Sequence, residues 1–72
     1  MSGSYHIIRY WSIAAGCRVA RIGLTDKHGQ EHFATVPMAQ LRGRLYRDKL
    51  GAVLDRVQSA IDDGQAPGEV RV

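Results

Sequence analysis

Five aliphatic residues in the second half of the chain constrain the fold more than any other feature of the sequence. They stand at i, i+3, i+4, i+7 and i+11, which is the spacing of one stripe along an α-helix. These residues are Leu50, Val53, Leu54, Val57 and Ile61. Burying five such side chains contributes roughly 7–15 kcal/mol of gross stabilisation. Because a lone helix of this length is only marginally stable in water, the first half of the chain must supply a surface on which it packs.

The end of this helix is marked by two residues. Gly64 follows the last member of the stripe, where glycine most easily adopts the left-handed conformation of a helix C-cap. Pro67 then prevents the helix from continuing.

Three segments in the first half of the chain are typical of β-strands. Tyr5–Ile13, Cys17–Thr25 and Gln30–Val36 are rich in β-branched and aromatic residues or alternate between two faces. The turn sequence Asp26–Gly29 joins the second and third segments and predicts a hairpin. The first strand most simply pairs antiparallel with the second, because neighbours in sequence usually pair in space.

Pro37 ends the predicted sheet and suits the first turn of a helix. Met38, Leu41 and Leu45 form a second stripe, which lies about 120° around the helix from the stripe that begins at Leu50. One straight helix would bury two different faces, so the pattern predicts a break near 48–51 and two helices. The expected fold is therefore α+β, a three-stranded antiparallel sheet followed by two helices packed on one face (β-β-β-α-α).

The domain organisation follows from the same pattern. A chain of 72 residues is one domain. We expect a flexible N-terminus over 1–4, a single α+β domain over 5–64 and a flexible C-terminal tail over 65–72. In that tail, Val70–Val72 is the alternative candidate for a short edge strand.

Composition predicts a soluble cytoplasmic protein. The single cysteine, Cys17, excludes an internal disulfide framework and fits a reducing compartment. No apolar run approaches the ~20 residues that span a bilayer, and the N-terminus lacks the order of a signal peptide. We therefore expect no membrane partner.

The sequence contains no recognisable catalytic motif. There is no glycine-rich phosphate loop, no G-x-S-x-G and no H-E-x-x-H. Cys17 is interpreted as a small buried hydrophobe rather than a nucleophile, and His28 and His32 as exposed hairpin histidines rather than metal ligands. We therefore expect no enzyme activity, no cofactor and no metal.

Basic residues are concentrated in the middle of the chain. Residues 37–56 carry five basic and two acidic side chains, whereas residues 57–72 carry one basic and three acidic side chains. This asymmetry suggests an anionic partner, although on charge alone a solvated helix face is the favoured interpretation. Arg9 and Trp11 share one strand face, which suits phosphate contact beside a stacking platform; alternatively, Trp11 is core and Arg9 lies over the sheet edge.

Two families resemble this chain. The element order and basic sheet resemble the three-stranded DNA-binding modules of tyrosine recombinases and AP2-type factors, which implies that Arg9, Arg18 and Arg21 would enter the major groove. The stretch Ile8–Ser12, the hairpin with a turn ending in Gly29 and the amphipathic helix are similar in order to small phage anti-CRISPR proteins of type I-F. That second resemblance implies that Tyr10 is an exposed binding aromatic.

The leading hypothesis is a small non-enzymatic binding protein of phage or mobile-element type that occludes a surface of a bacterial protein or nucleoprotein complex. If a phage encodes the chain, the expected location is the cytoplasm of the host bacterium. Aromatic residues and arginine dominate interface energies, so the expected partner-binding residues are Tyr5, Arg9, Tyr10 and Trp11. The alternative is a small DNA-binding regulator whose basic residues are Arg9, Arg18, Arg21, Arg42, Arg44 and Arg47. A homodimer with a helical interface is a third hypothesis, because association often completes a core this small.

Overall fold

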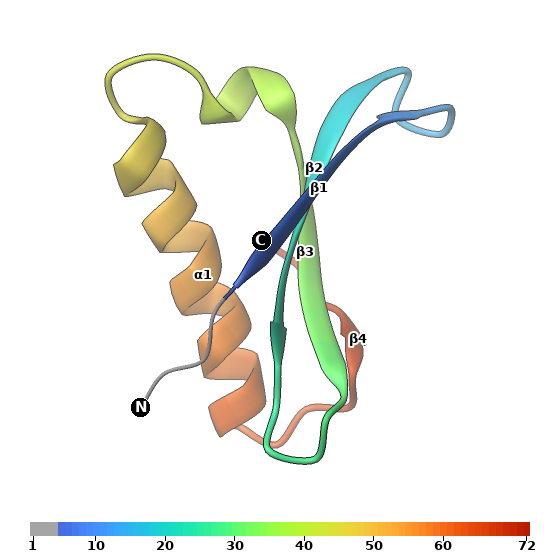
Figure 1. Cartoon of the computed structure of the whole chain (residues 1–72), viewed down its shortest axis with the longest axis vertical. Helices are drawn as coiled ribbons and strands as arrows, with labels where there is room; N and C mark the ends of the chain where they lie inside the picture. The colour runs from blue at the N-terminus through green and yellow to red at the C-terminus, as the bar shows by residue number, and fades with distance from the viewer. Residues whose placement is uncertain (1–4) are drawn as a thin grey trace.

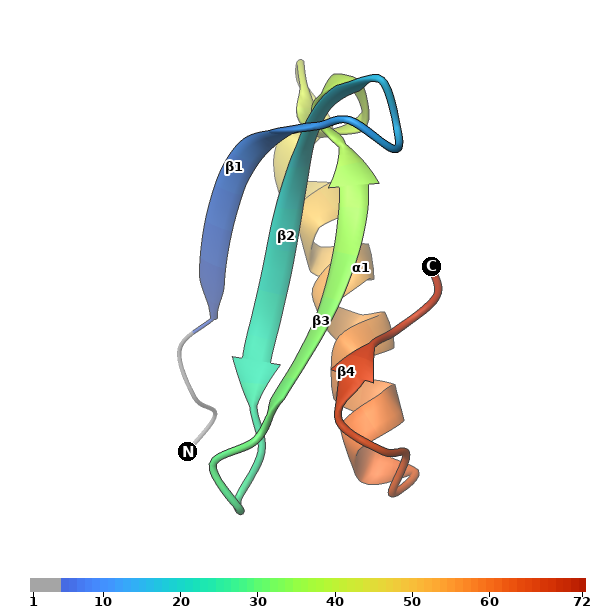
Figure 2. The same cartoon turned by 90° about the vertical axis from the view of Figure 1, so that its right-hand side faces the viewer.

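The computed structural model describes residues 5–72 and shows an α+β protein in which one helix packs on a four-stranded sheet (Figure 1). The predicted flexible segment 1–4 lies outside the described residues. In chain order the elements are β1 (His6–Ser12), β2 (Cys17–Thr25), β3 (Glu31–Pro37), the 3-10 turn η1 (Met38–Leu41), α1 (Tyr46–Asp62) and β4 (Gly68–Glu69). α1 runs along one face of the sheet and leaves the opposite face open (Figures 1 and 2).

The first three strands form the predicted antiparallel meander. β1 pairs with β2, and β2 pairs with β3 through a hairpin. In the hairpin turn the backbone N–H of Gly29 donates to the Asp26 carbonyl at 3.0 Å, and Gly29 has a φ of 80°, which glycine adopts without steric strain. The sheet therefore places each residue of β1 beside a known residue of β2, such as Trp11 beside Arg18 and His6 beside Gly23.

The prediction of a three-stranded, purely antiparallel sheet is wrong in one respect. The C-terminal segment returns to the sheet as β4, which pairs parallel with the first residues of β3. The backbone N–H of Val70 donates to the carbonyl of Phe33 at 2.6 Å, and Val70 is buried. The sheet is therefore mixed and has the order β1-β2-β3-β4.

The prediction of two helices broken near 48–51 is also wrong. α1 runs without interruption through those residues, and only one turn of 3-10 helix, η1, precedes it. The chain changes direction at Gly43, whose φ of 84° strains any other residue. Leu41 is buried as the second stripe requires, whereas Leu45 is 55% exposed because it stands outside the helix at the N-cap.

The C-terminal end of α1 closes as predicted at Gly64. The N–H of Gly64 donates to the Ile61 carbonyl at 3.0 Å, and the N–H of Gln65 donates to the Ala60 carbonyl at 3.0 Å. Gly64 has a φ of 72°, so the two bonds form a Schellman motif. This motif turns the chain back toward β3 and so positions β4.

The core lies between α1 and the face of β2 and β3 that α1 covers. It consists of two clusters. The first contains Ala20, Ile22, Val36, Leu41 and Leu50, and the second contains Ala34, Val57, Ala60 and Val70. The predicted stripe faces this core: Leu50 and Val57 are buried, while Val53, Leu54 and Ile61 are partly buried. Within residues 5–72, no helix is long and apolar enough to cross a membrane.

Candidate functional site

The strand β1 forms one edge of the sheet. It pairs only with β2, so in the described part of the chain its outer backbone groups have no partner strand (Figure 2). An edge of this kind presents a row of N–H and C=O groups to which another chain can hydrogen-bond. β1 is seven residues long and contains neither proline nor lysine, two of the residues that commonly protect such edges.

β1 is also the most exposed strand of the sheet. α1 packs against β2 and β3, and from β1 only Ile7 packs against a core cluster. The large apolar side chains of β1 and of the turn after it are therefore solvent-accessible. Their exposed fractions are 53% for Ile8, 40% for Tyr10, 62% for Trp11 and 91% for Ile13. A group of exposed apolar side chains is a typical mark of an interaction site.

The two faces of β1 differ in chemistry. On the face that α1 covers, which we call the helix side, Arg9 and Trp11 are nevertheless exposed, and the exposed Arg18 lies beside Trp11 on β2. On the opposite face, the open side, Ile8 and Tyr10 are exposed. The helix side of β1 is thus cationic and aromatic, whereas the open side is mainly apolar.

A polar network covers the lower part of the open side. The Glu31 carboxylate accepts hydrogen bonds from His6 Nε2 and from Arg21 Nη2, and so links β3 to both β1 and β2. These two bonds, that from His6 first, hold the pKa of Glu31 below its usual value. The Arg21 guanidinium also lies 3.7 Å from the centre of the Phe33 ring. The network passes directly over Gly23, where a Cβ would lie 2.5 Å from His6 Nε2 and 2.8 Å from Glu31 Oε2.

The predicted partner-binding residues all lie on or immediately before β1. Tyr5, Arg9, Tyr10 and Trp11 are exposed, but Tyr10 is on the open side and Arg9 and Trp11 are on the helix side. The interpretation of Trp11 as a core residue is wrong, because its position on β1 lies beyond the part of the sheet that α1 covers.

The six arginines of the DNA-binding hypothesis do not form one surface of the sheet. Arg9 and Arg18 are on the helix side, whereas Arg21 is on the open side and is paired with Glu31. Arg42, Arg44 and Arg47 lie in the connection from η1 to α1 and in the first turn of α1, and all three are exposed. Ion pairs among residues 5–72 involve Arg21 but none of the other five.

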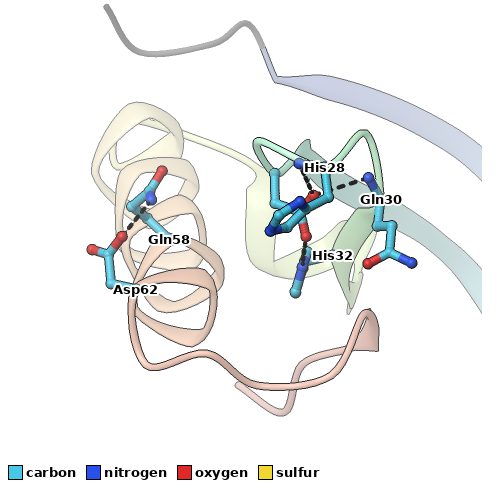
Figure 3. A network of polar contacts seen from close by, with 6 residues as sticks. His28, Gln30, His32, Gln58 and Asp62 are labelled. Atoms are coloured by element: carbon cyan, nitrogen blue, oxygen red, sulfur yellow. Dashed lines mark hydrogen bonds and ion pairs between the residues drawn. The ribbon is translucent and has the colours of Figure 1, made fainter.

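A second polar cluster lies at the tip of the β2–β3 hairpin, opposite the C-terminal end of α1. Asp26 accepts hydrogen bonds from the backbone N–H groups of His28 and Gln30, at 2.8 and 3.0 Å, and from His32 Nε2 at 2.8 Å. The backbone bond from Gln30 and the side-chain bond from His32 are the main causes that lower the pKa of Asp26 to about 2. Figure 3 shows His28, Gln30 and His32 gathered at the hairpin, with Gln58 and Asp62 on the helix.

His32 differs from its interpretation as an exposed hairpin histidine. It is 1% exposed, and in the described part of the chain its Nδ1 has no hydrogen-bond partner. The signal for burial was present in the sequence, because His32 alternates with Ala34 and Val36 on the face of β3 that packs on α1. Cys17 lies at the far end of β2 from this hairpin, and within residues 5–72 no three His, Cys, Asp or Glu side chains could hold a metal ion together.

The chain was compared with models of protein families, with curated proteins and with solved structures, and none of the three comparisons finds a match.

Proposed function

We propose that this chain is a non-enzymatic binding protein that pairs the outer edge of β1 with an extended segment of another protein. The observation that carries the proposal is the combination, in one strand, of a backbone edge that has no partner strand among residues 5–72 and exposed apolar side chains on both faces. Strand addition of this kind obtains affinity from main-chain hydrogen bonds and specificity from alternate side chains.

The side chains of β1 suit such a complex. Tyr10 and Trp11 are large and rigid, and residues of this kind supply most of the binding energy in protein interfaces. They lie on opposite faces of the strand, so an added strand contacts one of them on each face. In its narrower form, which follows the resemblance to anti-CRISPR proteins, the proposal takes the partner to be a bacterial protein or nucleoprotein complex whose surface the chain occludes.

The experiment that tests this proposal is a pull-down of the tagged protein from a nuclease-treated bacterial lysate, followed by affinity measurement with the recovered partner. Trp11→Ala should weaken that affinity about 30-fold or more, because truncation of an anchor residue costs at least ~2 kcal/mol. Leu45→Ala is the matched control, since Leu45 is 55% exposed but lies at the N-cap of α1, away from β1. Equal affinities of the two variants for the partner would reject β1 as the binding strand.

A second candidate function, nucleic-acid binding, is favoured by one observation. Exposed arginines without an acidic partner in the described residues lie near the end of the sheet where β2 begins and in the segment that enters α1. They are Arg9, Arg18, Arg42, Arg44 and Arg47. This function requires that duplex DNA binds and that its affinity falls steeply with salt through counterion release. A titration at two salt concentrations tests it, and binding that does not change with salt would exclude it.

A further inference from the structure

The region around β1 lacks free negative charge. Residues 5–24, which include all of β1 and most of β2, contain three arginines and no aspartate or glutamate. Glu31 is the acidic residue that reaches β1, through His6, and it lies on the open side, where it is already bonded to Arg21. Arg9 and Arg18, on the helix side, therefore have no acidic partner within the described residues.

The geometry of a sheet specifies what an added strand must present to these residues. Successive side chains of a strand point to opposite faces, so every second residue of an added strand lies on the helix side. Those residues meet Arg9 and Trp11, whereas the intervening residues meet Ile8 and Tyr10 on the open side. Opposite charges and aromatic–aliphatic pairs are the favourable cross-strand combinations for these two faces.

We infer that the partner of β1 is an extended protein segment in which acidic side chains alternate with aliphatic ones, the acidic residues facing Arg9, while Arg18, one strand further into the sheet, adds to the positive charge of the same side. This inference rests on the proposed function, because it names the chemistry of the strand that β1 adds. The charge on the helix side selects acidic residues, and the exposed Ile8 and Tyr10 select aliphatic ones.

Two other occupants fit the edge less well. A second copy of this chain would place another strand without acidic residues beside Arg9; when the two copies are centred on that residue, the two arginines face each other. A nucleic acid would supply negative charge, but its phosphate backbone cannot continue the ladder of backbone N–H and C=O groups along β1. An acidic protein strand satisfies the backbone, the charge and the apolar face together.

The test is a pair of NMR titrations of the full-length, ¹⁵N-labelled protein at low salt. One probe is a ten-residue capped peptide that alternates valine and glutamate, and the other alternates valine and lysine. We expect the amide signals of β1 to shift with the glutamate peptide, which should bind about ten-fold more tightly than the lysine peptide, since each exposed ion pair contributes about two- to five-fold. Arg9→Glu should abolish or reverse this preference, whereas Arg9→Lys should retain it.

Each other outcome overturns a defined part of the argument. If both peptides shift β1 with equal affinity, strand addition stands and the acidic preference is wrong. If the glutamate peptide shifts only the residues of the segment 42–49, it binds as a polyanion to the arginines there, and the assignment to β1 is wrong. If neither peptide shifts β1 up to millimolar concentration, strand addition itself is rejected. Arg18→Glu is a second variant for the same comparison of the two peptides, because Arg18 is exposed on the strand next to β1.

Discussion

The two edges of the sheet differ in whether another segment of the chain covers them. At the β3 edge, the C-terminal segment adds β4 beside the first residues of the strand, and Pro37, which has no N–H to donate, occupies the other end. At the opposite edge, β1 has no neighbour in the described residues although it carries the most exposed apolar side chains of the sheet. Soluble proteins generally protect their sheet edges, so an edge left open beside a protected one is a candidate binding surface.

The comparison also shows that strand propensity does not determine which edge is covered. β1 consists largely of aromatic and β-branched residues, whereas the two residues of β4 are glycine and glutamate. β4 is held in place instead by the two residues that follow it. Val70 is buried in the second core cluster, and Arg56 Nη2 donates to the Arg71 carbonyl at 3.0 Å. Packing after the strand, rather than the strand itself, holds the β3 edge closed.

The largest effect is expected when the closed edge is opened. Val70→Asp removes an apolar side chain that is 9% exposed and places a charge in the second cluster, so it should lower the free energy of unfolding by at least about 2 kcal/mol. Val72→Asp is the matched control, since Val72 is 59% exposed and should change the free energy of unfolding by about 0.5 kcal/mol or less. Urea denaturation followed by circular dichroism measures both. Equal losses would show that the C-terminal segment does not stabilise this edge.

A smaller effect on stability is expected at the open edge. There, substitution of Ile7 should affect folding, whereas substitution of its neighbour Ile8 should affect binding. Ile7 packs against the first core cluster, so Ile7→Ala should cost about 1–2 kcal/mol, less than for a fully buried isoleucine. Ile8 is 53% exposed, so Ile8→Ala should leave the free energy of unfolding within about 0.5 kcal/mol of the original value. Ile8→Ala should nevertheless weaken binding of the valine–glutamate peptide. A variant that loses stability and binding in parallel at Ile8 would contradict this separation.

The smallest expected effect is a loss of stability at acid pH, caused by protonation of the hydrogen-bonded carboxylates of Asp26 and Glu31. The folded-state pKa of Asp26 is lowered to about 2, mainly by the hydrogen bonds from Gln30 and His32, and the pKa of Glu31 is held below its usual value by the hydrogen bonds from His6 and Arg21. Because both folded values lie below the unfolded ones, these carboxylates stabilise the fold fully above about pH 5 and lose that contribution as pH falls toward 2. Thermal unfolding measured across this range should show the melting temperature falling.

Two variants show which edge is responsible for this loss of stability at acid pH. Asp26→Asn affects the hairpin tip, where His32 is the residue paired with Gly68 of β4, and Glu31→Gln affects the link from β3 to β1. Each should begin with a lower melting temperature at neutral pH and decline less on acidification. A variant that declines as steeply as the unmodified protein would show that its carboxylate is not the group responsible.

Much of the fold followed from local patterns in the sequence. The bounds of β2, the hairpin and the helical stripe were predicted because each depends on alternation, turn residues or helical spacing over a few neighbouring residues. A C-terminal edge strand was considered only as an alternative and at Val70–Val72, whereas β4 is Gly68–Glu69; its position depends on pairing with the distant His32 and Phe33, and glycine is a poor strand former. The helix break was placed near 48–51, whereas the chain changes direction at Gly43, because the offset between the two stripes does not show which glycine has a positive φ.

The candidate site was predictable in its residues but not in its arrangement. Tyr10 and Trp11 were identified from their chemistry, and the structure places both on the exposed strand. The alternation of β1 assigned each residue to a face, but it could not show that α1 leaves β1 uncovered, since this depends on where the helix crosses the sheet. The Glu31 network was also missed, because it brings together His6 and Arg21 from two other strands.

The C-terminal segment has a consequence for stoichiometry. A sheet with two open edges can pair directly with another chain on each side, whereas a sheet with one open edge can do so on one side only. Among residues 5–72, β4 pairs with the first residues of β3 and Pro37 ends that strand, so β1 is the longest strand edge without a neighbouring strand. If β1 adds a strand as proposed, each copy of this chain therefore pairs directly with one partner strand along β1.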